Sequence, residues 1–283
     1  MMSPWQGYLT YAPTSPVNEP TTKVAPPKKA PSLDSTVVKG FELVEFLADQ
    51  DEPIGVSSIA THFGWQKSNV HRLLSTLKAL GYVRQDTSTS RYEISLKTWE
   101  LGVKVLGRNV IKRCAQPSMH ALNRQFSENV NLSILVGKEV LYLDNVLSPY
   151  PLRTTASPGS RVPAVFPASG KAILAFREDA RAVCQEIISS HPQARDLDVE
   201  KLLTELEKIR QTGYAISLSG WRLNVNSIAA PILNRSGKSV AAIGISGPSE
   251  RMTEDVIEGM TSALLHAANQ VSEIYAGPGS ADF

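Results

Sequence analysis

The sequence predicts an α+β protein in which a winged helix-turn-helix is joined by a linker helix to a larger domain of mixed helices and strands. Three observations lead to this prediction. The chain has 283 residues, enough for about two domains at roughly 150 residues each. In its first third, three helix-like segments precede two short β-rich runs. In the remainder, strand-like runs are interleaved with helix-like ones, as in an α+β domain.

The composition is that of an ordinary globular protein, with 42% hydrophobic residues, 20% charged residues and a net charge of +2. It excludes a disordered chain, a collagen-like repeat and a disulfide scaffold. The two cysteines, Cys114 and Cys184, have no CxxC partner, so we expect no metal and no cofactor. No apolar run approaches the ~20 residues of a membrane span, and no signal-peptide pattern opens the chain. We therefore expect a cytoplasmic protein without a membrane partner.

Proline content and charge place the segment boundaries. Seven of the 18 prolines lie within residues 1–31, which predicts a disordered arm. We assign the winged helix-turn-helix to residues 32–95, the linker helix to 96–108 and the second domain to 109–277, followed by a flexible tail over 278–283.

The first two helices are predicted from caps and spacing. Ser35 or Thr36 is expected to cap a helix that ends near Asp49. Its apolar residues recur at helical spacing: Val37, Val38, Phe41, Val44 and Leu47. Ser57 is expected to cap a short second helix, and Gly64 supplies the tight turn that ends it.

The third helix and a hairpin complete this unit. The run "WQKSNVHRLLSTLKALG" carries an apolar stripe through Val70, Leu73, Leu74, Leu77 and Leu80, and Gly81 ends it. The runs "YVRQ" and "RYEIS" flank the polar turn "DTSTS" and predict a hairpin. Helix, helix–turn–helix and hairpin in this order form a winged helix-turn-helix.

Charge is segregated within this unit. Residues 36–60 contain five acids against Lys39, whereas residues 61–92 contain five bases against Asp86. The acids are Glu42, Glu45, Asp49, Asp51 and Glu52, and the bases are Lys67, Arg72, Lys78, Arg84 and Arg91. Because phosphates are neutralised locally, one electropositive side is what a surface that faces double-stranded DNA requires.

The apolar stripe of the third helix directs the polar residues near its start away from the core. The first half of a recognition helix contacts base edges. Arg72 suits a guanine or a phosphate, and Asn69 or Gln66 suits adenine. The predicted DNA-binding residues, the last two on the wing, are Gln66, Lys67, Ser68, Asn69, His71, Arg72, Arg84 and Arg91. Two alternatives stay open: a merely solvated helix face, or a helix-turn-helix that binds protein.

In the second part, a helix beginning near Leu96 has one apolar face, formed by Trp99, Val103, Leu106, Val110 and Cys114. Pro117 is expected to kink this helix or to start a new one that runs to about Phe126. The run "VNLSILVGKEVLYLDNV" predicts two strands around a turn at Gly137. A long loop over 148–168 is expected to be functional. Helices at about 169–177, 179–190 and 199–212, three strands, and a last helix at about 253–275 follow.

The start of the helix at Ser169-Gly170-Lys171 is the best anion site in the sequence. Free N–H groups at a helix start attract a carboxylate or phosphate, and Gly170 permits close approach. The segment is not a P-loop, because Val165 and Ala172 stand where that motif needs Gly and Ser/Thr. "GISGP" is not a nucleophile elbow, and the five histidines show no ligand pairing. We therefore expect a binding domain, not an enzyme.

The run "SIATHFGWQKSNVHRLLSTLKALGYVRQDTSTSRYEISLKTWELG" resembles the N-terminal domain of the IclR-type (isocitrate lyase regulator) transcription factors. The similarity extends over residues 34–275, through "GSRVPAVFPASGKAILAF" and "GYAISLSGWRLNVNSIAAPILNRSGKSVAAIGISGPSERMT". It implies a GAF/PAS-like effector-binding domain with a central antiparallel sheet. It also implies association into a homodimer or homotetramer through both domains.

The resemblance also implies which residues contact an effector. Ala168, Ser169 and Gly170 match the family's cavity segment, and the late strands contribute Ser227, Gly244 and Ser246. Ser217 stands where the family often has an acid, and Trp221 and Arg222 replace small or acidic residues. These changes favour an anionic effector, with Trp221 able to stack on an aromatic ring. The alternative for Trp221 and Arg222 is a plain surface loop.

We thus expect a ligand-responsive DNA-binding regulator of a catabolic operon that acts on a roughly palindromic operator as a homodimer or homotetramer. Its small-molecule effector is expected to be a small organic acid, with aromatic carboxylates as candidates. The competing hypothesis is a sensor-domain enzyme or small-molecule-binding protein whose helix-turn-helix mediates protein association.

Overall fold

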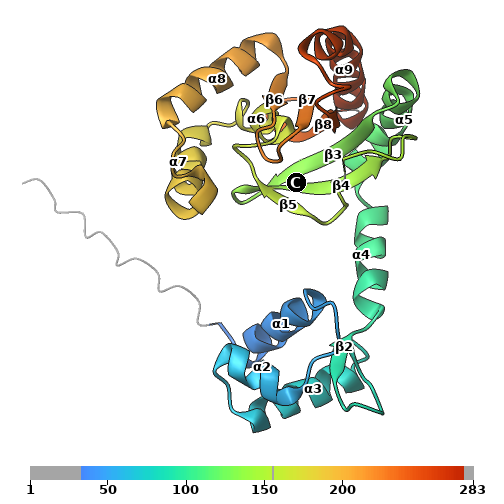
Figure 1. Cartoon of the computed structure of the whole chain (residues 1–283), viewed down its shortest axis with the longest axis vertical. Helices are drawn as coiled ribbons and strands as arrows, with labels where there is room; N and C mark the ends of the chain where they lie inside the picture. The colour runs from blue at the N-terminus through green and yellow to red at the C-terminus, as the bar shows by residue number, and fades with distance from the viewer. Residues whose placement is uncertain (1–32, 155, 277–283) are drawn as a thin grey trace, which may run out of the picture. The chain divides into compact units, whose positions relative to one another are not determined.

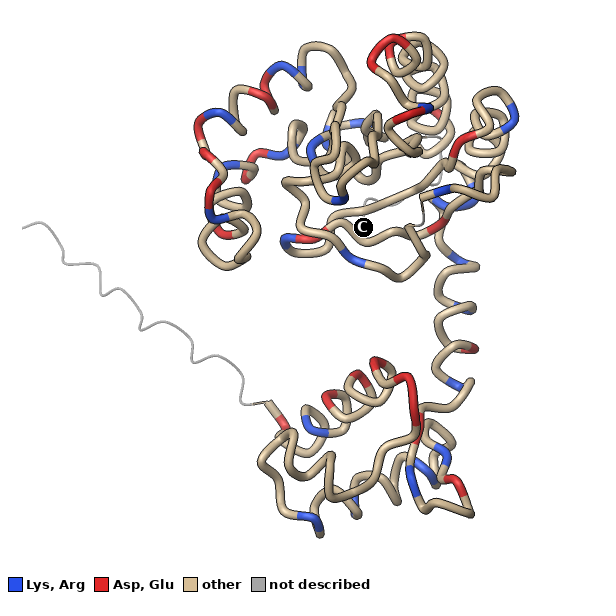
Figure 2. The backbone as a smooth tube through the Cα atoms, viewed as in Figure 1, with Lys and Arg blue, Asp and Glu red and all other residues tan. Residues whose placement is uncertain are grey.

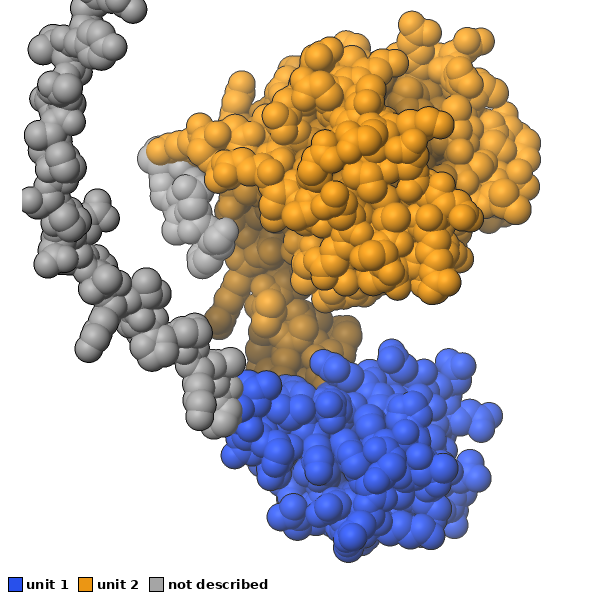
Figure 3. All heavy atoms as spheres, turned by 90° about the vertical axis from the view of Figure 1, so that its left-hand side faces the viewer, with its two compact units in different colours: residues 1–96 blue, residues 97–283 orange. Residues whose placement is uncertain are grey.

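The computed structural model describes residues 33–154 and 156–276 (Figure 1). The chain divides into two compact units after Leu96 (Figure 3). The predicted arm over 1–31 and the tail over 278–283 lie outside the described residues.

The first unit is the predicted winged helix-turn-helix. Its elements are α1 (Ser35–Ala48), α2 (Val56–Phe63), α3 (Lys67–Ala79), β1 (Val83–Gln85) and β2 (Tyr92–Ile94). The two strands pair antiparallel, and on the other side of β2 Ile54 forms an isolated antiparallel β-bridge with Tyr92. Leu43, Val70 and Leu74 are fully buried where the three helices meet. Buried apolar residues at helical spacing thus fix all three helices on one core.

Two predicted caps are wrong. The carboxylate of Asp34 caps α1 by accepting hydrogen bonds from the backbone N–H of Thr36 at 2.8 Å and of Val37 at 3.1 Å. Ser35 lies one residue too far along the chain to make these bonds. α2 begins at Val56 after Gly55 and has no side-chain cap, so Ser57 lies within the helix.

The buried face of α1 also differs from the predicted stripe. Leu43 and Leu47 are buried, and Phe46 packs beside them. Val37 and Phe41 are exposed. The core is therefore formed by the face of α1 that carries Leu43, Phe46 and Leu47 at spacings of three and four residues.

The second unit begins with α4 (Lys97–Gly107) and α5 (Val110–Phe126). The predicted interruption at Pro117 is wrong, because the break falls before Asn109, whose side chain caps α5 through the N–H of Lys112 at 3.0 Å. Pro117 and Arg113 are both exposed. Pro117 has no N–H to offer the Arg113 carbonyl, but α5 continues across it on a side of the helix that faces solvent.

A six-stranded antiparallel sheet in the order β5-β4-β3-β8-β7-β6 forms the centre of this unit. The predicted strands on either side of Gly137 and the three late strands are confirmed, and the short β5 was not anticipated. The strands are β3 (Asn129–Val136), β4 (Glu139–Val146), β5 (Arg161–Pro163), β6 (Ala215–Leu218), β7 (Val225–Leu233) and β8 (Ser239–Pro248).

Helices cover both faces of the sheet (Figure 1). On one face, α5 and α9 (Glu254–Tyr275) pack on Val130, Leu132 and their neighbours. On the other lie α6 (Ala168–Leu174), α7 (Ala180–Ser190), a 3-10 turn (Pro192–Ala194) and α8 (Val199–Thr212). Side chains alternate along a strand, so Asn129, Asn131 and Ser133 point to the α6 face. None of the described helices is long and apolar enough to span a membrane.

Candidate functional site

The polar residues of α3 lie on its solvent side. Val70, Leu73 and Leu74 anchor the helix in the core, which leaves the opposite side free for contacts. Of the predicted DNA-binding residues on and before α3, Asn69 is half-buried and the others are exposed: Gln66, Lys67, Ser68, His71 and Arg72. The geometry is that of a helix presented for insertion into a groove.

The two wing arginines differ. Arg84 lies opposite Glu93 in the hairpin register and pairs with it at 2.8 Å, although its side chain is 72% exposed. Arg91 is exposed next to the turn. Among the described residues, Lys67, Arg72 and Arg91 form no ion pair. These three charges are therefore available to an external anion, while that of Arg84 is partly neutralised.

The charge segregation predicted from the sequence is visible in the first unit (Figure 2). Acidic residues follow α1 and the segment after it, whereas basic residues lie along α3 and, together with Asp86 and Glu93, in the hairpin. A surface of one sign attracts a polyanion over several ångströms even when the domain is neutral overall.

The second unit contains a cavity of about 220 Å³ between the sheet and the start of α6. This is smaller than the ~300–1,000 Å³ typical of sites for drug-sized ligands, and it suits a small metabolite. Eight of the nine residues predicted from the sequence to contact an effector line this cavity: Ala168, Ser169, Ser217, Trp221, Arg222, Ser227, Gly244 and Ser246.

Gly170 is the ninth, and it lies outside the cavity lining. A Cβ on Gly170 would stand 2.1 Å from the carbonyl oxygen of Ala164, so the glycine allows two backbone segments to touch. Its N–H donates to the carbonyl of Pro167 at 3.1 Å. Lys171 pairs with Glu205 of α8 at 2.8 Å. Gly170 and Lys171 therefore hold α6 in place, whereas the expected close approach of an effector to Gly170 stays a prediction.

The described lining of the cavity is electropositive. Arg161 and Arg222 belong to it, and no aspartate or glutamate among the described residues does so. Glu139, which lies outside the lining, pairs with Arg161 at 3.6 Å and partly offsets its charge. Burial raises the pKa of the Tyr142 phenol, and a hydrogen bond from Ser169 and the charge of Arg222 only partly offset this effect. Tyr142 is thus a neutral hydroxyl in the cavity wall at physiological pH.

Trp221 is part of the cavity wall. Its ring lies 5.2 Å from Phe166 and 6.0 Å from His191, in tilted arrangements. It is half-buried, whereas the neighbouring Arg222 is exposed at its surface. The indole is therefore held by aromatic packing, which leaves part of its surface for a ligand.

Several cavity residues were not found from the sequence, among them Asn131, Tyr142, Thr154 and Arg161. A usable signal exists in β3, where Asn129, Asn131 and Ser133 alternate with apolar residues and all three are buried. Polar side chains on a buried strand face require partners or a function.

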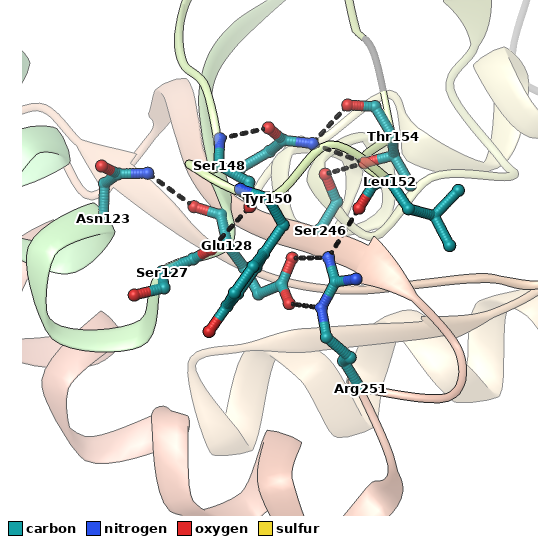
Figure 4. A network of polar contacts seen from close by, with 10 residues as sticks. Asn123, Ser127, Glu128, Ser148, Tyr150, Leu152, Thr154, Ser246 and Arg251 are labelled. Carbon is teal, nitrogen blue, oxygen red and sulfur yellow. Dashed lines mark hydrogen bonds and ion pairs between the residues drawn. The ribbon is translucent and has the colours of Figure 1, made fainter.

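A polar network fastens the segment after β4 to the rim of the cavity (Figure 4). The buried carboxylate of Glu128 accepts from Arg251 Nε at 2.5 Å and from its terminal nitrogen at 2.9 Å. The same guanidinium donates to the carbonyl of Leu152 at 3.0 Å and lies 4.7 Å from the Tyr150 ring. A Cβ on Gly247 would stand 2.6 Å from Glu128, so glycine makes room for the pair.

Asn129 fastens the far end of the same segment. Its amide nitrogen donates to the carbonyl and hydroxyl of Thr154, and its oxygen accepts from the N–H of Ser148 at 2.7 Å. Thr154 Oγ1 lies 3.3 Å from Ser246 Oγ, and both residues line the cavity. The network therefore positions one wall of the cavity.

Replacing Arg251 with lysine is expected to lower the free energy of unfolding of the second unit by about 2 kcal/mol, because a single ammonium cannot serve both oxygens of the buried Glu128 carboxylate. Chemical denaturation of the full chain measures this change. Arg177→Lys is the matched control, since Arg177 makes a similar two-point pair with Asp179 at the surface. It should change stability by less than about 0.5 kcal/mol. Equal losses at the two positions would contradict the role of the buried pair.

The described residues contain no group of three or more His, Cys, Asp or Glu side chains that could hold a metal ion. Cys184 is buried, and burial raises the pKa of its thiol to about 11. It is therefore a packed thiol rather than a nucleophile at neutral pH.

Comparison with known proteins matches both units. Residues 36–87 match the IclR helix-turn-helix domain, and residues 103–273 match the bacterial transcriptional regulator IclR C-terminal domain. The chain is 32% identical to the HTH-type transcriptional regulator KdgR of Dickeya chrysanthemi over 260 residues, which covers 89% of this chain and 84% of KdgR.

Two solved structures are similar over most of the chain. Thermotoga maritima IclR is 28% identical with a TM-score of 0.68 and covers 86% of this chain and 99% of its own. The second is an IclR homologue from Microbacterium hydrocarbonoxydans in complex with 4-hydroxybenzoate. It is 21% identical with a TM-score of 0.70, and the match covers 84% of this chain and 98% of that chain. At this identity the similarity shows a common fold. With both of its units matched in this order, the chain belongs to the IclR family of bacterial transcriptional regulators.

Proposed function

We propose that this protein is a cytoplasmic, ligand-responsive DNA-binding regulator of a catabolic operon, with a small organic acid as its effector. The observation that carries the proposal is the combination, in one chain, of an exposed cationic recognition helix and a cavity whose charged residues, in the part of the chain that the structure describes, are both arginines. The helix supplies sequence recognition through α3, and the cavity supplies a signal.

The effector proposal rests on the charges and shapes in the cavity wall. Arg161 and Arg222 favour an anion, and hydroxyl-bearing side chains offer further hydrogen bonds. Trp221 provides an aromatic surface, which makes aromatic carboxylates the first candidates. The homologue that binds 4-hydroxybenzoate is in keeping with this class. Effector binding alters operator affinity only if it favours one arrangement of the DNA-binding units.

We also propose that the protein binds its operator as a homodimer, or as a homotetramer built from such dimers. One winged helix contacts too few bases to select a site in a genome. α4 buries none of its residues in the single chain, and Trp99 is 65% exposed with Leu96 and Val103 beside it in the same stripe. An apolar stripe of this kind is suited to a second copy of the chain.

The experiment that tests the regulator measures binding of the full chain to fragments upstream of its own and adjacent genes, by fluorescence anisotropy at increasing salt. We expect one fragment to bind at least ~1,000-fold more tightly than random sequence. We also expect affinity to fall steeply with salt, and one organic acid to change it by ~5–150-fold.

The competing hypothesis is a sensor-domain enzyme, or a small-molecule-binding protein whose helix-turn-helix mediates protein association. It predicts that the protein prefers none of the DNA fragments, whether or not organic acids are present. The cavity lining favours the regulator, since its residues within 33–154 and 156–276 include no histidine, cysteine or carboxylate to serve as an acid–base pair. Sequence-independent binding at every salt concentration would exclude the proposed operator.

A further inference from the structure

Two asparagines on one strand face differ in their hydrogen bonding. Asn129 and Asn131 are two residues apart on β3, so both side chains point toward α6. The Asn129 carboxamide is fully used, because its nitrogen donates twice to Thr154 and its oxygen accepts from Ser148. It is a structural residue that holds Thr154, a residue of the cavity wall, in place.

The Asn131 carboxamide is the opposite case. The residue is only 6% exposed and lines the cavity. Among residues 33–154 and 156–276, it has no hydrogen-bond partner. Its amide atoms are not among the fully enclosed polar atoms of the described residues, so they open into the cavity, and the partner that the chain does not supply comes from water or a ligand there.

The neighbours of Asn131 leave its amide open. In the sheet register it lies opposite Gly244, and Gly244 lies opposite Ala229. A Cβ on Gly244 would stand 3.1 Å from Asn131 Oδ1, so a side chain at that position would crowd the amide oxygen. Gly244 on the adjacent strand β8 and Ala229 on β7, one strand further, therefore leave room beside the carboxamide, while on β4 Asn131 lies opposite Asn145.

We propose that Asn131 is a specificity-determining residue that recognises a hydroxyl group carried by the effector in addition to its carboxylate. A carboxamide has two N–H donors and an acceptor oxygen. A hydroxyl satisfies both kinds of group, because it accepts from Nδ2 and donates to Oδ1. A carboxylate only accepts and is repelled by Oδ1, and Arg161 and Arg222 provide its natural partners in the same cavity. The inference rests on the proposed role of the cavity as an organic-acid site.

Matched pairs of acids that differ by one hydroxyl test this inference. We would measure calorimetrically the affinity of the full chain for benzoate against 3- and 4-hydroxybenzoate, and for butanoate against 3- and 4-hydroxybutanoate. In the wild type, at least one hydroxy acid should bind about tenfold or more tightly than its parent, since the parent leaves the amide unpaired. In Asn131→Leu, the hydroxy acid should lose that advantage while the affinity of the parent is retained.

Ser133→Ala is the control variant, since the Ser133 hydroxyl is buried on the same face without a partner but does not line the cavity. It should leave the preference for the hydroxy acid unchanged. Equal losses for both acids in Asn131→Leu would overturn the inference by assigning the amide to the carboxylate, and an undiminished preference would overturn it outright. If neither acid of any pair binds the wild-type protein, the result contradicts the proposal that the effector is a small organic acid, on which the role of Asn131 rests.

Stability without any ligand gives a second readout. Because Asn131 has no partner among the described residues, Asn131→Leu breaks no hydrogen bond within them and should leave the melting temperature of the ligand-free second unit unchanged or raise it. Asn129→Leu should lower it, since Thr154 and Ser148 lose their bonds. A fall for Asn131→Leu as large as that for Asn129→Leu would mark Asn131 as structural and overturn the proposal. Should the leucine variant fail to fold, Asn131→Ala carries the same expectation for acid selectivity.

Discussion

Replacing Arg72 with alanine is expected to abolish the preference of the protein for its operator while leaving effector affinity unchanged. The guanidinium is exposed on α3, has no ion pair among the described residues, and lies on the side opposite the buried Leu73 and Leu74. One two-point contact to guanine contributes ~1–3 kcal/mol of discrimination. The proposed dimer would lose two such contacts, or ~2–6 kcal/mol, which corresponds to about 30-fold or more in operator affinity.

Anisotropy against the operator and a scrambled duplex of equal length measures this loss, together with footprinting. Lys78→Ala is the matched control, because it removes the same charge from the last turn of α3, where Lys78 donates to Gln85 at 2.9 Å. Lys78→Ala should weaken binding to both duplexes alike and preserve the footprint. A normal footprint from Arg72→Ala would refute the assignment of α3 as the recognition helix.

Replacing Gly170 with alanine is expected to destabilise the second unit by about 3 kcal/mol or more, beyond most single substitutions. The new Cβ would meet the oxygen, carbon and Cα of Ala164 at 2.1, 2.7 and 2.8 Å, and all three are backbone atoms. α6 is almost wholly buried, so it has no free direction in which to move. Relief of the contact therefore requires α6 to separate from the turn before it, which opens the core on this face of the sheet.

Chemical denaturation of the full chain measures the effect, with the first unit as an internal reference. Gly259→Ala in α9 is the control, because Gly259 is exposed and a Cβ there meets nothing within 4 Å. It should raise stability by ~0.5–1 kcal/mol through helix propensity. If Gly170→Ala instead unfolds like the wild type but no longer binds an organic acid, the glycine serves ligand approach, as the sequence suggested, and the packing explanation fails.

The sequence predicted the helices and strands better than the residues that cap or interrupt them. The three helices, the hairpin and the late strands follow from periodicity and turn glycines such as Gly64, with φ of +66°, which are properties of a few consecutive residues. The caps at Asp34 and Gly55 and the uninterrupted α5 across Pro117 were missed. In each case the boundary of the helix depends on which group hydrogen-bonds to its free N–H groups or leaves a carbonyl exposed to water. The spacing of apolar residues does not contain that information.

Eight residues that line the cavity were predicted by matching sequence motifs to the family. The arrangement of these residues and the positive charge of the cavity wall were not predicted. The sequence by itself determined the two-part organisation, the cationic α3 and the family, because these depend on local pattern. Only the tertiary structure decided that Gly170 packs against the backbone of Ala164, that Arg84 is paired with Glu93, and that Asn131 faces the cavity without a partner among the described residues. The physical reason is that the cavity is assembled from strands and helices distant along the chain. A side chain there acquires or lacks a partner only once the sheet has brought those segments together.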